Sequence, residues 1–208
     1  MSLKCKFDKE RGLPLILTGF VILLDQITKT FIAARWPINS RIWPDIANFN
    51  SENLLQIIHV RNTAIAFSIG QNLPPEVKRI LFVILPIIVL IVLVWYYLSS
   101  DEFTKLQRWA IAGILGGGIG NIADRIFRTY EYNGELRGGV VDFISVRFFG
   151  LFGFERWPTF NVADSSVVVS CLLLLVTIFV SSKKAATPDR SAEQSARQFK
   201  EPADEQET

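Results

Sequence analysis

The chain alternates between long apolar runs and shorter polar segments. The apolar runs occupy residues 13–34, 80–98, 109–127 and 162–180. A helix needs about 20 predominantly apolar residues to cross the hydrocarbon core of a bilayer. The pattern therefore predicts an all-α membrane protein with four transmembrane helices.

The segments between these runs have a different pattern. Residues 54–69, LLQIIHVRNTAIAFSI, alternate in part between apolar and polar side chains, which predicts one or two strands on the membrane surface. VVDF at 140–143 is a further strand candidate, residues 128–139 are polar and turn-like, and the Phe-rich and Trp-rich residues that follow are typical of a membrane interface. We expect a small extracytoplasmic β-rich element, with His59 exposed or interfacial and not catalytic.

The two ends of the chain are polar. The N-terminal residues are basic and lead into an apolar run that resembles a secretory signal, but this run continues past Asp25 without a small-residue cleavage site. We therefore expect an uncleaved first helix. Residues 183–208 have no apolar periodicity, which predicts a membrane domain at 1–182 and a disordered tail. Basic residues at both ends, including Lys183 and Lys184, favour two cytoplasmic termini.

Composition narrows the chemistry. Half of the residues are hydrophobic (50%) and only 20% are charged, which indicates a membrane protein, and the net charge of +2 gives no reason to expect a nucleic-acid partner. Cys5 and Cys171 would lie at different membrane depths, so we expect no disulfide. With one histidine and no CxxC or HExxH spacing, we expect neither a metal nor a cofactor. Carboxylates, hydroxyls, amides and lysine remain for catalysis.

Polar residues interrupt the first and third runs, where a charged side chain is costly unless protein or water shields it. Asp25 and Lys29 are four residues apart and share one helical face, either as an intrahelical ion pair or as one wall of a site. In the third run, Gly113 and Gly117 have the spacing that lets membrane helices approach closely. The same face continues to a polar final turn with Asn121, Asp124 and Arg125.

The last run begins with a polar pair. Asn161 stands at an N-cap position and Asp164 follows three residues later, where the helix dipole alone could account for a carboxylate. Asp142 is either a strand acid that faces water or a partner of Asp164. Asn62 is either a solvated turn amide or part of a site.

Depth along the four predicted spans places these polar residues near one membrane interface. The set consists of Asp25, Lys29, Asn62, Asn121, Asp124, Arg125, Asp142, Asn161 and Asp164. If the VVDF strand docks beside the last helix, Asp142 and Asp164 face each other. Two close carboxylates cannot both ionise cheaply, so they would share a proton, one acting as a base toward water and the other as an acid.

The same residues lie in five blocks that resemble those of the lipoprotein signal peptidase (signal peptidase II) family. The blocks are LDQITK at 24–29, NTAIAFS at 62–68, GGGIGNIADRI at 116–126, VVDF at 140–143 and FNVADS at 160–165, in the order of the family. The resemblance implies an aspartic endopeptidase of the bacterial inner membrane that removes the signal peptide of prolipoproteins just before the diacylglyceryl-modified cysteine. Its partners would be these substrates and membrane lipid, and we expect a monomer with its active site near the outer leaflet.

The resemblance also assigns roles. It implies that Asp142 and Asp164 are catalytic and that the other residues bind substrate or support the site, namely Asp25, Lys29, Asn62, Gly117, Asn121, Asp124, Arg125 and Asn161. Three features depart from the family pattern: Ala64 replaces a usual glycine, the segment before Asp142 is longer, and a polar tail follows the last run.

Three other classes of protein fit the residues. An ion or proton carrier could use Asp25, Lys29, Asp124 and Asp164 as an intramembrane relay, although the chain has no recognisable inverted repeat. A serine and lysine protease could use Ser165 or Ser166 with Lys29. The third alternative is a purely structural membrane subunit.

Overall fold

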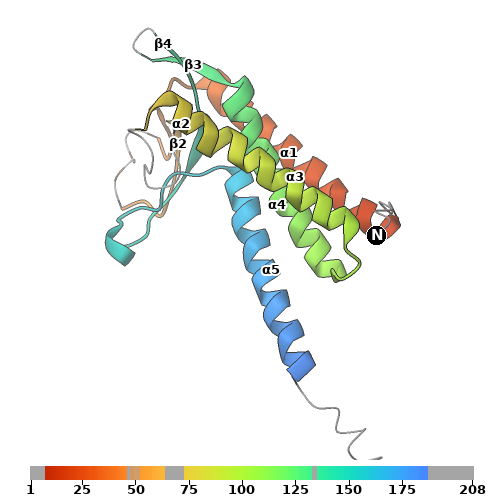
Figure 1. Cartoon of the computed structure of the whole chain (residues 1–208). Coiled ribbons are helices and arrows are strands. Elements are labelled where there is room, and N and C mark those ends of the chain that lie inside the picture. The colour runs from red at the N-terminus through yellow and green to blue at the C-terminus, as the bar shows by residue number, and fades with distance from the viewer. Residues whose placement is uncertain are drawn as a thin grey trace, which may run out of the picture. The chain divides into compact units, whose positions relative to one another are not determined.

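Figure 1 shows the computed structural model, which describes residues 8–45, 48, 50, 52–63, 73–132 and 135–186. In chain order the elements are α1 (Lys9–Arg35), β1 (Arg41–Trp43), β2 (Leu55–Asn62), α2 (Pro75–Arg79), η3 (Ile80–Ile84), α3 (Leu85–Ser99), α4 (Lys105–Phe127), β3 (Thr129–Tyr132), β4 (Glu135–Gly138), β5 (Val140–Val146), η4 (Leu151–Gly153) and α5 (Val162–Ala186).

Internal contacts divide the chain into two units, Met1–Leu174 and Leu175–Thr208. The first unit contains every element up to the N-terminal part of α5, and the candidate site lies within it. The expected tail at 183–208 stays a prediction, because residues 187–208 lie outside the described residues, as does Ala64.

Three helical segments are long and apolar enough to cross a membrane, namely Lys9–Arg35, Pro75–Ser99 and Val162–Val180. They coincide with three of the four predicted spans. Large apolar side chains are exposed along them, as contact with lipid requires. On α1 these side chains include Leu13, Ile16, Phe20, Leu23 and Ile27. The protein is therefore a membrane protein.

The predicted span at 109–127 forms α4, a helix of 23 residues that is not among these three segments. A fourth span therefore stays a prediction. Glycines let α4 approach α1 closely, since a Cβ atom on Gly116 would lie 2.8 Å from the Val21 Cβ atom. The Thr18 hydroxyl also donates a hydrogen bond to the Ala112 carbonyl at 2.8 Å. Gly113 and Gly117 face α5 in the same way, since a Cβ atom there would collide with Ser170 or with Ala163. The predicted glycine spacing therefore lies where α4 approaches another helix closely.

The second apolar run is helical but not uniform. Pro86 stands in the first turn of α3 and lacks the N–H group that would bond to the Phe82 carbonyl. A π-helical segment, η3, precedes this proline and joins α2 to α3. The three elements form one continuous helical segment from Pro75 to Ser99.

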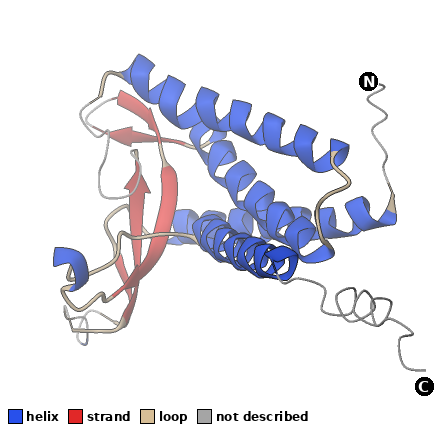
Figure 2. Ribbon diagram, turned by 60° about the horizontal axis from the view of Figure 1, so that its bottom comes forward, coloured by secondary structure: helices blue, strands red, loops and turns tan. Residues whose placement is uncertain are grey.

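Two small antiparallel sheets lie at one end of α1 and α4 (Figure 2). The larger sheet has the order β1-β2-β5, and Asp142 of β5 is opposite Val60 of β2. Val141 and Phe143 pack with Ile32 of α1, which fastens β5 to the helices. The segment expected to be turn-like before β5 instead forms the two strands β3 and β4, consistent with its one threonine and two tyrosines.

Candidate active site

Asp142 lies in β5 with its carboxylate buried between two amide side chains. The Asn62 Nδ2 group donates to Asp142 Oδ2 at 2.9 Å, and the Asn161 Nδ2 group donates to Asp142 Oδ1 at 2.7 Å. The side chain is 2% exposed. The interpretations of Asp142 as a strand acid that faces water and of Asn62 as a solvated turn amide are therefore wrong.

Asp164 lies in the first turn of α5 and forms a reciprocal cap with Asn161. The Asp164 N–H group donates to Asn161 Oδ1 at 2.9 Å, while the Asn161 N–H group donates to Asp164 Oδ2 at 3.1 Å. This arrangement is a capping box, which fixes the helix start and both side chains. The local capping interpretation is thus correct, but the Asn161 amide also contacts Asp142 and so links the two acids.

Asn121 of α4 completes the contacts of Asp164. Its Nδ2 group donates to Asp164 Oδ1 at 2.7 Å. Its Oδ1 atom accepts from Asn161 Nδ2 at 3.1 Å and from Lys29 Nζ at 2.9 Å. The orientation of the Asn121 amide is consequently set by Lys29, whose three N–H groups can only donate.

Lys29 is fully buried in a cluster of charges between α1 and α4. Its ammonium lies 2.8 Å from Asp25 Oδ2 and 3.4 Å from Asp124 Oδ2, and both carboxylates are buried as well. Asp25 and Lys29 therefore form the predicted intrahelical ion pair and, through Asn121, also adjoin the predicted site.

The two acids of this cluster also hold backbone groups next to Asp142 and Asp164. Asp25 Oδ1 accepts from the Ala163 N–H group at 3.0 Å. Asp124 Oδ2 accepts from the Val141 N–H group at 3.1 Å. Each contact fixes the backbone of the residue that immediately precedes one of the paired acids.

The last two predicted residues lie on α4 at the edge of this cluster. A Cβ atom on Gly117 would collide with the Ala163 carbonyl oxygen, so only glycine lets α4 approach the start of α5 this closely. The Arg125 guanidinium carbon lies 6.0 Å from the centre of the Phe82 ring, and its charge is attracted to Asp142, Asp164 and Asp124.

Sequence reasoning did not identify Gln26 and Arg128 as site residues. Gln26 Nε2 donates to Asp25 Oδ2 at 3.2 Å and to Asp124 Oδ1 at 3.0 Å. Arg128 Nε donates to Asp124 Oδ1 at 3.2 Å. Arg128 follows Asp124 by four residues, and this helical spacing could have indicated the pair.

Burial and the negative charge of Asp164 raise the pKa of Asp142 from 3.8 to about 7, an effect that the Asn62 and Asn161 amides oppose only in part. Near neutral pH the Asp142 carboxyl therefore holds a proton for much of the time. Asp164 lies in the first turn of α5, at the positive end of the helix dipole, and accepts a hydrogen bond from the Asn121 amide. Two acids in such different environments can supply an acid and a base at the same pH.

His59 is buried, so the expectation that it would be exposed or interfacial is wrong. Its Nδ1 atom lies 2.8 Å from the Trp36 carbonyl oxygen, and burial lowers the pKa of the imidazole. The residues that follow α1 cover this face of β2, which the local alternation of residues could not indicate. His59 has no contact with Asp142 or Asp164 among the bonds described for it.

The two candidate serines are bonded to backbone carbonyls rather than to Lys29. Ser165 Oγ donates to the Asn161 carbonyl at 2.9 Å, and Ser166 Oγ donates to the Gly113 carbonyl at 2.9 Å. This geometry lacks the nucleophile and base contact of a serine and lysine protease. Within the part of the chain that is described, no three His, Cys, Asp or Glu side chains are grouped to hold a metal ion.

Comparisons with known proteins agree with this geometry. Residues 17–180 match the sequence model of the family described as Signal peptidase (SPase) II. The lipoprotein signal peptidase of Treponema pallidum (strain Nichols) is 38% identical over 195 residues, covering 94% of this chain and 97% of the relative. The lipoprotein signal peptidase of Treponema denticola is 44% identical over 176 residues, covering 85% of this chain and 94% of the relative.

Two solved structures described as those of a bacterial membrane enzyme are similar to this chain, each with 26% sequence identity. One has a TM-score of 0.65 and covers 91% of this chain and 98% of its own. The other has a TM-score of 0.62 and covers 86% of this chain and 97% of its own.

Proposed function

The chain belongs to the signal peptidase II family, and we propose that it is a membrane aspartic endopeptidase that removes the signal peptides of lipoprotein precursors. The observation that supports this most directly is the Asn161 side chain, which bonds to Asp142 and caps the helix turn that carries Asp164. One amide thereby contacts one acid directly and caps the helix turn that carries the other.

The proposed reaction uses Asp142 as the acid and Asp164 as the base. Asp164 takes a proton from a water molecule as the water oxygen attacks the scissile carbonyl carbon, and Asp142 gives its proton to the carbonyl oxygen. In the resulting diol, Asp142 recovers a proton from one hydroxyl group while Asp164 gives its proton to the departing amine nitrogen. The C–N bond breaks, and both acids return to their starting states.

Six neighbours of the pair position it for this reaction. The amides of Asn62, Asn121 and Asn161 bond to carboxylate oxygens, so each carboxyl keeps its orientation while its charge changes. Asp25 and Asp124 hold backbone groups, and Lys29 forms an ion pair with each of them. Pre-organised contacts of this kind avoid reorganisation during the reaction.

The position of the pair suits a lipid-anchored substrate. Asp142 lies in a sheet at the ends of α1 and α4, and Asp164 lies at the first turn of a membrane-spanning helix. We place this end near the outer leaflet of the bacterial inner membrane, with both termini cytoplasmic. Acyl chains of a diacylglyceryl-modified cysteine could stay in the bilayer while water reaches the peptide bond on its N-terminal side.

The test is cleavage of a diacylglyceryl prolipopeptide by purified Asp142→Asn and Asp164→Asn variants. Asn keeps the shape of the side chain but cannot exchange protons, so each variant should lose cleavage and still fold and insert. Asp45→Asn is the matched control, because Asp45 is an exposed acid of the loop after β1 and should keep wild-type turnover. Normal turnover by either site variant would contradict the two-acid mechanism.

An intramembrane ion or proton carrier is the alternative that uses the same acids. The backbone contacts of Asp25 and Asp124 support a bracing role for this cluster instead of a relay. An ion flux into proteoliposomes that Asp164→Asn abolishes, combined with no peptide cleavage by the wild type, would favour the carrier.

A further inference from the structure

Asp142 lies on the outgoing leg of a hairpin, and Asp164 lies in the helix that directly follows its return leg. After β5, the chain turns at η4 and returns beside its own path to Phe160, directly before Asn161 and α5. The return leg is bonded to the outgoing leg, since the Trp157 N–H group donates to the Val146 carbonyl at 2.9 Å and the Phe160 N–H group donates to the Ile144 carbonyl at 2.9 Å. A movement of the turn would therefore displace both acids together.

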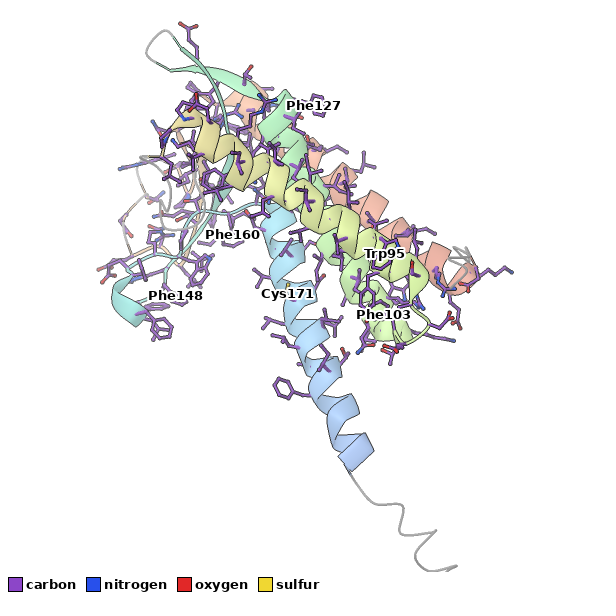
Figure 3. All side chains as sticks on the ribbon, viewed as in Figure 1. Trp95, Phe103, Phe127, Phe148, Phe160 and Cys171 are labelled. Atoms are coloured by element: carbon purple, nitrogen blue, oxygen red, sulfur yellow. The ribbon has the colours of Figure 1, made fainter. Side chains whose placement is uncertain are left out.

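The turn of this hairpin, residues 148–154, which we call the aromatic tip, exposes large apolar side chains. Phe149 is 68% exposed, Leu151 53%, Phe152 83% and Phe154 40%. Figure 3 shows Phe148 of the tip away from the packed helices. Four such side chains within six residues expose apolar area that water would solvate poorly.

The backbone of the tip is strained at two of these residues. Phe149 and Phe152 have φ angles of 55° and 53°, in the left-handed region that bulky residues rarely adopt. Beside the turn, the Phe148 and Trp157 rings form an edge-to-face pair with centroids 5.0 Å apart, and Trp157 is itself 39% exposed. The hairpin thus presents aromatic side chains that no described residue covers.

Arginines at the base of the tip add a positive charge beside the apolar surface. The Arg147 guanidinium lies 5.1 Å from the centre of the Phe149 ring, and Arg156 is close enough for the two charges to repel. Arg156 donates to Ser145 Oγ and to the Ser145 and Asn53 carbonyls, so its side chain fastens the hairpin. Arg147 forms no ion pair with a carboxylate among the described residues, and a phosphate at headgroup depth would suit it.

We propose that the aromatic tip inserts into the outer lipid layer, with Arg147 at the level of the headgroup phosphates, and thereby sets the depth of Asp142 and Asp164. The partner is the phospholipid bilayer itself. Aromatic rings beside arginine are the side chains that favour the membrane interface. This inference rests on the proposed function for its consequence, since the depth of the pair would decide whether it meets a lipid-anchored peptide bond.

The depth of the tip can be measured without any catalysis. A nitroxide label is attached to the Phe152→Cys variant, in which Cys5 and Cys171 are replaced by serine. The labelled protein is reconstituted into vesicles of phosphatidylethanolamine and phosphatidylglycerol. Power saturation then compares the accessibility of the label to oxygen and to a water-soluble nickel complex. We expect the label to be more accessible to oxygen than to nickel. The matched control is Glu131→Cys on β3, an exposed acid that should favour nickel. Equal nickel accessibility at both positions would overturn the insertion.

The consequence for catalysis needs a second comparison. Phe149→Ser/Phe152→Ser should lower cleavage of a lipid-anchored peptide about tenfold in these vesicles, by shifting the pair from its depth, and leave cleavage in detergent micelles unchanged. Phe127→Ser removes an equally exposed ring, 82%, from the end of α4 and should change neither. Equal loss in micelles would mean damage to the hairpin and would refute the depth role. Absence of cleavage by the wild type would refute the proposed function, but not the insertion measured by the label.

Discussion

Replacing Lys29 with methionine should destabilise the protein strongly, because the ammonium is the positive charge that joins two buried carboxylates. Lys29 Nζ lies 2.8 Å from Asp25 and 3.4 Å from Asp124. In Lys29→Met, Asp124 keeps Arg128 at 3.2 Å, whereas Asp25 keeps only the neutral donors of Gln26 and Ala163. The uncompensated charge is therefore mainly that of Asp25.

Removing one partner of a buried ion pair costs about 3–5 kcal/mol of unfolding free energy. For a chain of this size each kcal/mol lowers Tm by about 2–4 °C, so the midpoint should fall by roughly 6–20 °C. Thermal unfolding in detergent, followed by tryptophan fluorescence, measures the shift. Lys105→Met is the matched control, since its ammonium lies 3.4 Å from Glu10 in an exposed pair worth less than about 1 kcal/mol.

A double-mutant cycle separates the charge effect from lost packing. Asp25→Asn/Lys29→Met has no isolated carboxylate on α1 and should recover part of the loss, with a coupling free energy of about 1–3 kcal/mol. Cleavage should stay low in both variants, because the Asn121 amide loses the donor that orients it. A Tm for Lys29→Met within the range of Lys105→Met would refute the reasoning.

Two further predictions concern the acid pair and the helix contact beside it. Cleavage should decline as pH rises through about 7, since Asp142 then loses the proton that it donates. Between about pH 4 and 7, Asp142 also binds more protons in the folded state than in the unfolded state, so its contribution to the free energy of unfolding falls as pH rises. Denaturant titrations at several pH values should show this slope in the wild type and not in Asp142→Asn. Gly117→Ala should lower cleavage and reduce the free energy of unfolding by about 1–3 kcal/mol, because the new methyl group meets the Ala163 carbonyl. Gly118→Ala is the control: its methyl group meets only the movable Leu90 side chain, so its activity and Tm should be close to those of the wild type.

The apolar runs predicted most of the helices, because lipid imposes a length and a composition that can be counted along the chain. The start of α5 was also predictable, since Asn161 and Asp164 cap the helix through contacts only three residues apart. The third run was harder to assign as a membrane span. α4 packs against α1 through small residues, so it need not be as apolar as a helix that lipid surrounds.

The contacts that position the site are not local, and the sequence did not indicate them. Asp25 bonds to a backbone group 138 residues away, and Gln26 reaches Asp124 across 98 residues. No helical or strand periodicity encodes such pairs. The resemblance to a family could name Asp25 and Asp124 as supporting residues. Only the structure shows that these two acids hold backbone groups next to the paired acids.

These backbone contacts give the buried charges a role that differs from that of the paired acids. Asp25 on α1 fixes the residue before Asp164, and Asp124 on α4 fixes the residue before Asp142. Since Lys29 bonds to both Asp25 and Asp124, the two anchored backbones are joined through one ammonium. The separation of the paired acids therefore depends on how α1 and α4 pack, which the glycines of α4 determine. A cluster that would be costly in lipid is stable here because each of Asp25, Lys29 and Asp124 has a charged partner, and the same cluster fixes the backbone beside both paired acids.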